Sequence, residues 1–426
     1  MKIILSGGGT GGSVTPLLAI AEELKTQHKG EIDFLWLGTK KGIERKMVET
    51  QGIKFRPIFS GKFRRYFSFK NFIDPIFIVM GFFQSLWINL VFKPDIILTA
   101  GGFVAVPVVF SGWLLRIPVL VHQQDVEIGL ANKLMMPFAK IITCSLQEAG
   151  SRRDGLQCVS TTKGKVYFTG NAIRKNIFNT RSREELEKKF NLERNIPTVL
   201  ILGGGTGAMA VNNIVVQTIS ELTKFCQVIH ITGGKILPPP QGRMSKKCVI
   251  LNPSARRAKN PRVFSFNHGI LHSLGLVQDD AKGLRHHGWD GRGGVFPATN
   301  QDEPANRYHP YPFISNVEDI FEVSDLVISR CGMAFLSELA VLGKPAILIP
   351  IPDSHQEANA KYFFDRNAAR VLNQKTLTAK SLVDNIKKLL QDKETMKNYS
   401  DNMKKIMPMD GAKKIAEIVL RQLNKN

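Results

Sequence analysis

The feature that most constrains this chain is an apolar strand that runs directly into a cluster of glycines, and it occurs twice. Residues 2–6 lead into Gly7-Gly8-Gly9-Thr10-Gly11-Gly12, and residues 198–202 lead into Gly203-Gly204-Gly205-Thr206-Gly207. Glycine lets the backbone approach an anion closely, and the N-terminus of the following helix attracts it. A glycine turn can also be purely structural. Two such units, one in each half of the chain, predict an α/β protein with two Rossmann-like parallel-sheet domains that face a cleft.

Length and composition agree with this prediction. A chain of 426 residues that is 43% hydrophobic has enough apolar side chains for two separate cores. The five cysteines are scattered and lack C-x-x-C spacing, so we expect neither a disulfide framework nor a zinc site. The apolar start runs into glycines and not into a cleavage site, so we expect no secretory signal. A net charge of +22 favours a partner such as nucleic acid, an anionic membrane surface or an acidic substrate.

The second predicted strand argues against one common use of this fold. An NAD-dependent oxidoreductase usually has an acidic residue at the end of this strand, which binds the ribose of the cofactor. Here the strand at residues 32–37 ends in Gly38-Thr39. The sequence therefore disfavours an oxidoreductase and favours a sugar nucleotide as the ligand.

An apolar stretch between Pro75 and Lys93 is at the lower length limit of a membrane span. The residues of a narrow polar stripe recur along one side of the predicted helix: Gly81, Gln84, Ser85 and Asn89. Basic residues flank it at both ends: Lys62, Arg64, Arg65, Lys70 and Lys93. The strand at residues 95–99 should join the same sheet as residues 2–6, and a membrane crossing would separate the two. We therefore predict a helix on an anionic membrane surface, with a buried helix or a true span as alternatives.

Polar residues follow another strand of the first half. Residues 119–121 lead into His122-Gln123-Gln124-Asp125, and the strand before them leads into the glycine turn Gly101-Gly102. Open α/β sheets bind their ligands at the carboxyl ends of the strands. His122 is either a site residue or a histidine with a purely structural role, and Asp125 is the stronger candidate for chemistry.

Seven motifs, taken together and in order, resemble those of the MurG family of peptidoglycan glycosyltransferases. They are GGGTGG from Gly7, AGGFVAVP from Ala100, HQQDVEIGLANK from His122, GNAIRKN from Gly170, LGGGTGA from Leu202, SRCGMAFLSELAVLGKPAILIP from Ser329 and HQEANA from His355. The resemblance covers residues 1 to about 235 and 308–426. It implies a GT-B fold and an inverting transfer of N-acetylglucosamine from UDP-N-acetylglucosamine to the C4 hydroxyl of N-acetylmuramic acid in lipid I, which forms lipid II. It also implies a peripheral protein on the cytoplasmic face of the cell membrane.

The resemblance assigns the donor site residue by residue. The helix that begins near Met333 receives the diphosphate, and Glu338 accepts hydrogen bonds from the ribose, although a solvated helix face is the alternative for Glu338. Ile314 holds uracil through its backbone, Gln356 and Asn359 contact the transferred sugar, and Arg174 meets the donor from the other side. The full set of predicted donor residues is Thr10, Gly11, Gly12, Asp125, Arg174, Gly205, Thr206, Ile314, Met333, Ala334, Phe335, Leu336, Ser337, Glu338, Gln356 and Asn359.

The acceptor side is assigned in the same way. The two glycine turns of the first half would hold the lipid diphosphate through Gly9, Gly11, Gly12, Gly101 and Gly102. The chain contains no D-x-D motif, so we expect no metal and no other cofactor. The expected partners are UDP-N-acetylglucosamine, undecaprenyl-linked lipid I and an anionic membrane surface that meets residues 62–93; we expect no nucleic acid.

Three departures from the family pattern bear on catalysis. Ser13 stands where the family usually has a histidine, and a serine hydroxyl is no general base near neutral pH. The usual Glu-Gln-Asn reads Gln123-Gln124-Asp125, so Asp125 becomes the candidate base. Gly205 replaces a serine, and Thr206 beside it offers a hydroxyl. A soluble UDP-sugar 2-epimerase or a non-catalytic UDP-sugar-binding homologue therefore stays open as an alternative.

The domain limits follow from the same motifs. We predict an N-terminal acceptor and membrane-binding domain at 1–171, a C-terminal UDP-N-acetylglucosamine-binding domain at 172–408, and a last helix at about 409–426 that returns to the first domain. Residues 238–306 have no helical or strand period and are rich in glycine and proline. We expect a disordered basic insertion there, or else an arm that binds a membrane or nucleic acid.

Overall fold

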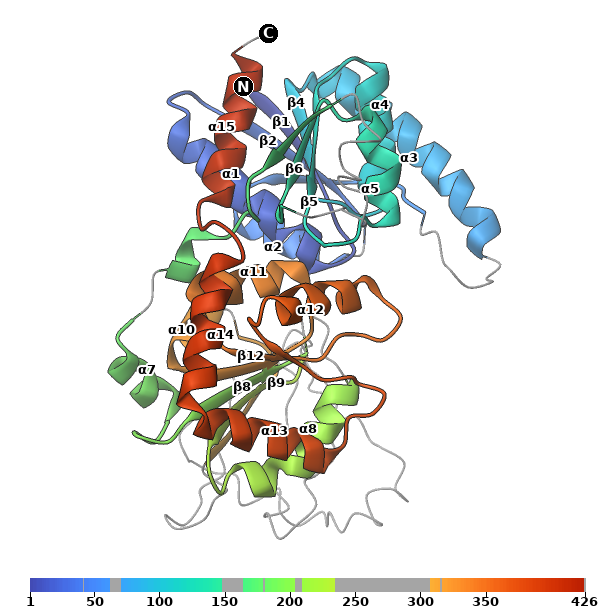
Figure 1. The fold of residues 1–426 in the computed structure, drawn as a ribbon. Helices are drawn as coiled ribbons and strands as arrows, with labels where there is room; N and C mark the ends of the chain where they lie inside the picture. The colour runs from blue at the N-terminus through green and yellow to red at the C-terminus, as the bar shows by residue number, and fades with distance from the viewer. Residues whose placement is uncertain are drawn as a thin grey trace, which may run out of the picture.

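The computed structural model describes residues 1–40, 42–61, 70–147, 164–178, 181–203, 209–233, 307–314 and 316–424, and the side chains of residues 70–75 are not among the described parts. The predicted insertion at 238–306 and the second glycine turn with Gly205 and Thr206 lie outside these ranges. So does the basic stretch at residues 62–69. The described chain forms two parallel sheets with helices around them, one above the other in Figure 1. The predicted GT-B architecture is confirmed.

The N-terminal domain is built on a seven-stranded sheet in the order β3-β2-β1-β4-β5-β6-β7, in which every pair of neighbours is parallel. Its strands are β1 (Lys2–Ser6), β2 (Asp33–Gly38), β3 (Lys54–Pro57), β4 (Ile96–Thr99), β5 (Val119–Gln123), β6 (Ile141–Cys144) and β7 (Lys165–Phe168). Its helices are η1 (Gly11–Ser13), α1 (Thr15–Gln27), α2 (Glu44–Thr50), α3 (Lys70–Phe92), α4 (Ala105–Leu114), α5 (Leu130–Met135) and η2 (Met136–Phe138). The central strands are buried on both faces, which explains their continuous apolar runs.

The C-terminal domain repeats this plan on a six-stranded parallel sheet in the order β10-β9-β8-β11-β12-β13. Its strands are β8 (Thr198–Leu202), β9 (Gln227–Ile231), β10 (Tyr308–Tyr311), β11 (Leu326–Ser329), β12 (Ala346–Leu348) and β13 (Arg370–Val371). Its helices, with the linking turn η3, are η3 (Lys175–Phe178), α7 (Arg183–Phe190), α8 (Met209–Leu222), α10 (Val317–Val323), α11 (Met333–Leu342), α12 (His355–Asp365), α13 (Ala379–Gln391) and α14 (Lys393–Lys405).

Both strand orders reverse direction at one point, between β1 and β4 in the first sheet and between β8 and β11 in the second. Parallel sheets bind ligands outside the carboxyl ends of the strands at such a point. The turns that follow β1 and β4 carry the predicted acceptor glycines, and the turn after β11 opens the predicted donor helix α11. The topology thus brings the motif residues to the two edges where ligands bind. Helix α11 also contacts η1, so the two edges meet.

The last helix, α15 (Gly411–Leu423), lies in the N-terminal domain, beside α1 (Figure 1). Its apolar face places Ala412, Ile415, Ala416 and Val419 in the same core as Leu17 and Trp36. Ile415 and Val419 have no exposed surface. The C-terminal end of the chain therefore completes the core that its N-terminal end begins.

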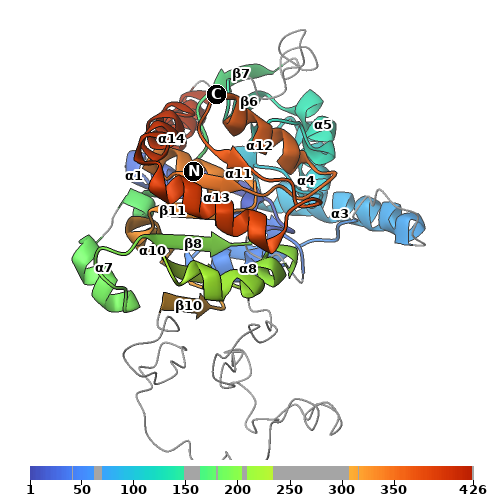
Figure 2. The same cartoon turned by 60° about the horizontal axis from the view of Figure 1, so that its bottom comes forward.

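Helix α3 is amphipathic, with its polar side against the protein and its apolar side exposed. Its polar stripe faces the protein: Ser85 and Asn89 are buried, and Asn89 Nδ2 donates to the hydroxyl of Ser111 on α4 at 2.9 Å. Its apolar side chains face outward, with Phe83 62% and Trp87 67% exposed. In Figures 1 and 2 the helix projects from the side of its domain. Within the described residues, no helix combines the length and the apolar character that crossing a membrane requires.

Candidate active site

The first glycine turn joins β1 to α1 and is held by its own backbone and by Ser13. Gly9 has a φ of +87°, a conformation that favours glycine. The Ser13 hydroxyl donates to the carbonyls of Gly8 and Thr10, both at 3.3 Å, so this side chain stabilises the turn. Thr10, Gly11 and Gly12 lie at the start of η1, where the N–H groups of a helix N-terminus have no partner within the helix.

The second glycine turn follows β4 and touches the first. Gly101 and Gly102 have φ values of +104° and +98°. A Cβ at Gly102 would lie 2.8 Å from the carbonyl oxygen of Gly8. The close approach of the two turns requires glycine at this position. The structure therefore brings together all five predicted acceptor glycines: Gly9, Gly11, Gly12, Gly101 and Gly102.

A buried carboxylate that sequence reasoning did not assign supports the first turn. Glu44, at the start of α2, has no exposed surface. It accepts hydrogen bonds from Thr39 N at 2.8 Å, from the Thr39 hydroxyl, and from Gly9 N at 3.4 Å. The Glu44 carboxylate thus links the loop after β2 to the glycine turn through hydrogen bonds. The available signal was an acidic residue a few positions beyond the strand end where a dinucleotide-binding protein carries its ribose ligand.

His122 has a structural role. One ring nitrogen, Nδ1, hydrogen-bonds with the Thr143 hydroxyl and the other, Nε2, with Asn171 Oδ1, each at 2.9 Å. Asn171 Nδ2 in turn donates to the Ser337 hydroxyl on α11 at 2.8 Å. Burial lowers the pKa of His122 to about 4, so the ring is neutral at physiological pH. This chain of hydrogen bonds joins β5, the interdomain segment and α11, the predicted donor helix.

Asp125 and Asn359 meet across the domain boundary. Asn359 Nδ2 donates to Asp125 Oδ1 at 2.8 Å and to the Cys331 carbonyl at 2.9 Å, and its Oδ1 accepts from Val126 N at 3.0 Å. Asp125 belongs to the loop after β5, and Asn359 is buried on α12. The structure therefore places the predicted base next to a residue that is predicted to contact the transferred sugar.

Glu338 and Arg174 form an ion pair. Arg174 Nη2 lies 2.8 Å from Glu338 Oε1, and the Glu338 side chain is only 6% exposed, so the solvated-face alternative is wrong. Burial raises the pKa of Glu338, and the charge of Arg174 opposes that rise. The structure thus pairs two of the predicted donor residues with each other. Both contacts of Arg174 are with the same carboxylate oxygen, Oε1.

The remaining predicted donor residues surround the start of α11. Met333, Leu336 and Ser337 are buried, so Met333 and Leu336 can reach a ligand only through their backbone. Ala334 and Phe335 lie in the same turn, where Phe335 packs against Phe321. Gln356 Oε1 accepts from Cys331 N at 3.1 Å and from Ile351 N at 3.2 Å, which ties α12 to the turn after β11. Ile314 packs against the edge of the core.

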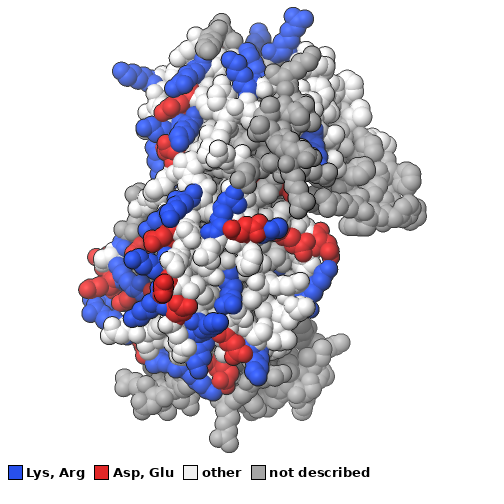
Figure 3. Space-filling model, viewed as in Figure 1, with Lys and Arg blue, Asp and Glu red and all other residues white. Residues whose placement is uncertain are grey.

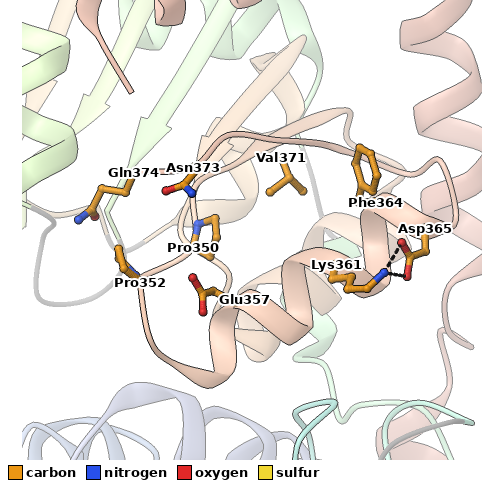
Figure 4. Close-up of a pocket in the computed structure, with 9 residues that line it drawn as sticks. All are labelled: Pro350, Pro352, Glu357, Lys361, Phe364, Asp365, Val371, Asn373 and Gln374. Carbon is orange, nitrogen blue, oxygen red and sulfur yellow. Dashed lines mark hydrogen bonds and ion pairs between the residues drawn. The ribbon is translucent and has the colours of Figure 1, made fainter. Parts of the chain in front are cut away.

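Two other features of the described residues bear on ligands. They contain no group of three or more His, Cys, Asp and Glu side chains arranged to hold a metal ion. A hollow of about 440 Å³ lies between α12 and the strand and loop that carry Val371, Asn373 and Gln374 (Figure 4). None of the predicted donor residues lines it. Helix α12 therefore presents Glu357 and Lys361 to this hollow, and Asn359 to the domain boundary.

Charge is spread over the described surface. In the view of Figure 3, Lys and Arg side chains alternate with Asp and Glu over the C-terminal domain. Charged residues of the C-terminal domain form ion pairs, such as Arg183 with Asp325 at 3.0 Å and Arg307 with Glu193 at 2.8 Å. Exposed pairs of this kind contribute little to stability. On this face the positive net charge is not gathered into one patch.

Known proteins share both the sequence pattern and the fold. Residues 3–143 match the glycosyltransferase family 28 N-terminal domain, and residues 291–417 match the glycosyltransferase family 28 C-terminal domain. A Bacillus cereus protein named UDP-N-acetylglucosamine–N-acetylmuramyl-(pentapeptide) pyrophosphoryl-undecaprenol N-acetylglucosamine transferase 2 is 32% identical over 400 residues, which are 93% of each chain. A Clostridium botulinum protein, named as the same kind of transferase, is 32% identical over 423 residues, 98% of each chain. The crystal structure of Acinetobacter baumannii MurG shares the fold, with a TM-score of 0.64 at 20% identity over 99% of both chains.

Proposed function

The chain belongs to glycosyltransferase family 28, and from this membership we propose that it transfers N-acetylglucosamine from UDP-N-acetylglucosamine to the C4 hydroxyl of N-acetylmuramic acid in lipid I, forming lipid II for peptidoglycan. The observation that carries the proposal for this chain is the contact between Asp125 and Asn359 at 2.8 Å. This hydrogen bond joins the proposed acceptor domain to the proposed donor domain. Its two side chains are the proposed base, Asp125, and a residue proposed to contact the transferred sugar, Asn359.

Asp125 is the general base of the proposed mechanism. Its carboxylate takes the proton of the C4 hydroxyl as the hydroxyl oxygen attacks the anomeric carbon from the side opposite UDP. A new C–O bond forms, the anomeric C–O bond to the phosphate breaks, and its electron pair leaves with UDP. Attack from the opposite side inverts the anomeric configuration. Ser13 has no part in proton transfer, because its hydroxyl donates to the backbone of the glycine turn.

The donor is held by the C-terminal domain. The first N–H groups of α11 and the helix dipole face the diphosphate and stabilise the charge that develops on the departing UDP. Glu338 accepts hydrogen bonds from the ribose, since a carboxylate is acceptor-only and suits a diol. Arg174 contacts Glu338 Oε1 from the interdomain segment, and in the proposed complex its guanidinium pairs with the anionic donor. These groups meet the departing charge without a metal.

The acceptor is held by the N-terminal domain at the membrane surface. The two touching glycine turns offer backbone N–H groups to the lipid diphosphate. The N–H groups of Gly9 and Gly101 are not among them, because they donate to Glu44 and to the Thr99 hydroxyl. The outward apolar face of α3 enters the leaflet beside it. Exposed apolar side chains on two neighbouring helices add to this face: Trp113 and Leu114 on α4, and Leu130 and Leu134 on α5. This arrangement supports a peripheral position on a membrane surface, and family membership is the reason to propose the cytoplasmic face of the cell membrane.

The test is transfer of labelled N-acetylglucosamine from UDP-N-acetylglucosamine to a short-chain lipid I analogue, with released UDP measured in parallel. We expect labelled lipid II analogue and UDP in equal amounts. Donor binding without product would instead show a non-catalytic homologue. Formation of UDP-N-acetylmannosamine from the donor alone would show a 2-epimerase.

A further inference from the structure

Asn359 is buried on α12, and its side chain makes hydrogen bonds on both sides of the domain boundary. Nδ2 donates to Asp125 Oδ1 at 2.8 Å and to the Cys331 carbonyl at 2.9 Å, and Oδ1 accepts from Val126 N at 3.0 Å. An asparagine amide has two N–H donors and two acceptor positions on its oxygen. Both donors and one acceptor position are therefore in use, which leaves a single acceptor position for a hydroxyl of the transferred sugar.

These contacts fix the Asp125 carboxylate relative to the proposed donor site. Val126 is the next residue of the chain, so Asn359 holds both the side chain of Asp125 and the backbone that follows it. Cys331 lies in the turn that opens α11, the helix proposed to receive the donor diphosphate. The other carboxylate oxygen of Asp125, Oδ2, has no hydrogen-bond partner among the described residues. One amide thus engages Oδ1 and leaves Oδ2 to take a proton.

We propose that Asn359 is a positioning residue for the transfer reaction, which orients the Asp125 carboxylate across the domain boundary. This role goes beyond a contact with the transferred sugar. The inference rests on the proposed function, since Asp125 is the base of the proposed mechanism. Because the two residues belong to different domains, the base is held in place only while the domains are together.

The experiment is a double-mutant cycle on kcat for transfer to a short-chain lipid I analogue, measured on the full chain. Asn359→Ala is made in wild type and in Asp125→Asn. Gln356→Ala, in the same two backgrounds, is the matched comparison: it removes another α12 amide that bonds to Cys331, but one whose described hydrogen bonds do not include Asp125. Calorimetry with UDP shows whether each variant is folded, since UDP lacks the sugar that these two residues are proposed to contact.

In wild type, Asn359→Ala should lower kcat by roughly 10- to 100-fold, the usual effect of losing a hydrogen bond to a charged group. The KM for UDP-N-acetylglucosamine should change less than kcat. In Asp125→Asn the same substitution should change kcat by no more than about twofold, because the carboxylate that it positions is gone. Gln356→Ala should have the same effect in both backgrounds. If Asn359→Ala costs as much in Asp125→Asn as in wild type, the inference is wrong.

Asn359→Asp serves if the alanine variant does not bind UDP. It keeps the size of the side chain and an oxygen that accepts from Val126 N, but it has no N–H to donate to Asp125. In Asp125→Asn the introduced amide supplies that N–H, so Asn359→Asp should cost less there than in wild type. Full activity of Asp125→Asn would overturn the inference and leave the proposed transfer intact. If wild type forms no product, the proposed function fails and takes the inference with it.

Discussion

In the proposed mechanism the chemistry depends on Asp125, and one substitution separates its role as a base from its hydrogen bond with Asn359. In Asp125→Asn the side chain keeps the Oδ1 atom that accepts from Asn359, but it can no longer take a proton. We expect kcat for transfer to fall by about 10²–10⁴, the usual contribution of a general base, with the KM for UDP-N-acetylglucosamine little changed. Glu127→Gln, an exposed carboxylate two residues further along, is the matched control. Full activity of Asp125→Asn would show that the base lies elsewhere.

The lowered pKa of His122 predicts how stability depends on pH. Burial lowers its pKa to about 4, whereas the unfolded chain has the ordinary value of 6.5, so between these values the unfolded state binds more protons. The free energy of unfolding should therefore fall as the pH drops from 6.5 towards 4, by up to about 1.4 kcal/mol per pH unit for this group. His230 and His309 are lowered in the same way and add to the slope.

Urea unfolding at a series of pH values measures this slope. A His122→Asn variant loses hydrogen bonds and will be less stable at every pH, but its slope should be shallower by up to one proton. The slope counts protons and is independent of the absolute stability. An unchanged slope would mean that His122 is protonated in the folded protein.

Gly102 occupies a position that only glycine fits, both in its backbone conformation and in the space around it. A Cβ there would lie 2.8 Å from the Gly8 carbonyl oxygen, and its φ of +98° is unfavourable for other residues. Gly102→Ala should lower the free energy of unfolding by at least about 1–2 kcal/mol, the cost of a left-handed alanine, and should raise the KM for lipid I more than that for the donor. Gly129→Ala is the control, since its Cβ would meet nothing within 4 Å. Thermal melts and kinetics of both variants check this, and equal behaviour would contradict it.

At the scale of elements, the exposed apolar face of helix α3 predicts that this helix binds a membrane surface. Among the described side chains of α3, Phe83 and Trp87 are the most exposed aromatic ones. Each apolar side chain that enters a leaflet contributes about 1.5–3 kcal/mol. Phe83→Ser combined with Trp87→Ser should therefore weaken binding to anionic phospholipid vesicles at least about tenfold in a sedimentation assay. Phe364→Ser, an equally exposed aromatic on α12 of the other domain, should leave it unchanged. Equal loss in both variants would point to a non-specific effect.

The elements differ in how well the sequence predicts them. The strands and glycine turns were predictable because their signals are local: a buried parallel strand is apolar throughout, and only glycine fits the turn. The orientation of α3 was not, because apolar periodicity gives a face but not its direction. Its polar stripe packs inward through Asn89 and Ser111, which are far apart in sequence.

The candidate site shows the same limit. Family motifs brought Asp125, Arg174, Glu338 and Asn359 to attention, but nothing in the sequence pairs Arg174 with Glu338 or Asp125 with Asn359. Both contacts depend on how the domains meet. The role of Glu44 was missed for a similar reason, because its carboxylate reaches Gly9 only after the loop following β2 folds back onto the first turn.

At the scale of the whole molecule, the chain closes on itself through α15, and this predicts where a C-terminal mutation acts. Ile415 is fully buried against the core of the N-terminal domain. Ile415→Ala removes buried methyl groups and should cost about 2–5 kcal/mol. Ile418→Ala deletes the same atoms from the same helix at a partly exposed position and should cost less than half as much. A local readout shows in which of the two domains the loss of stability falls.

Hydrogen exchange followed by mass spectrometry provides that readout. In Ile415→Ala, peptides from α1 and β1 should lose protection, although they lie at the opposite end of the sequence. Peptides from β8 and α8 should keep it, since their core contains no residue of α15. Loss of protection confined to the C-terminal domain would contradict this assignment of α15. The expected pattern would instead show that the N-terminal domain depends for its stability on a helix that follows the whole C-terminal domain in the sequence.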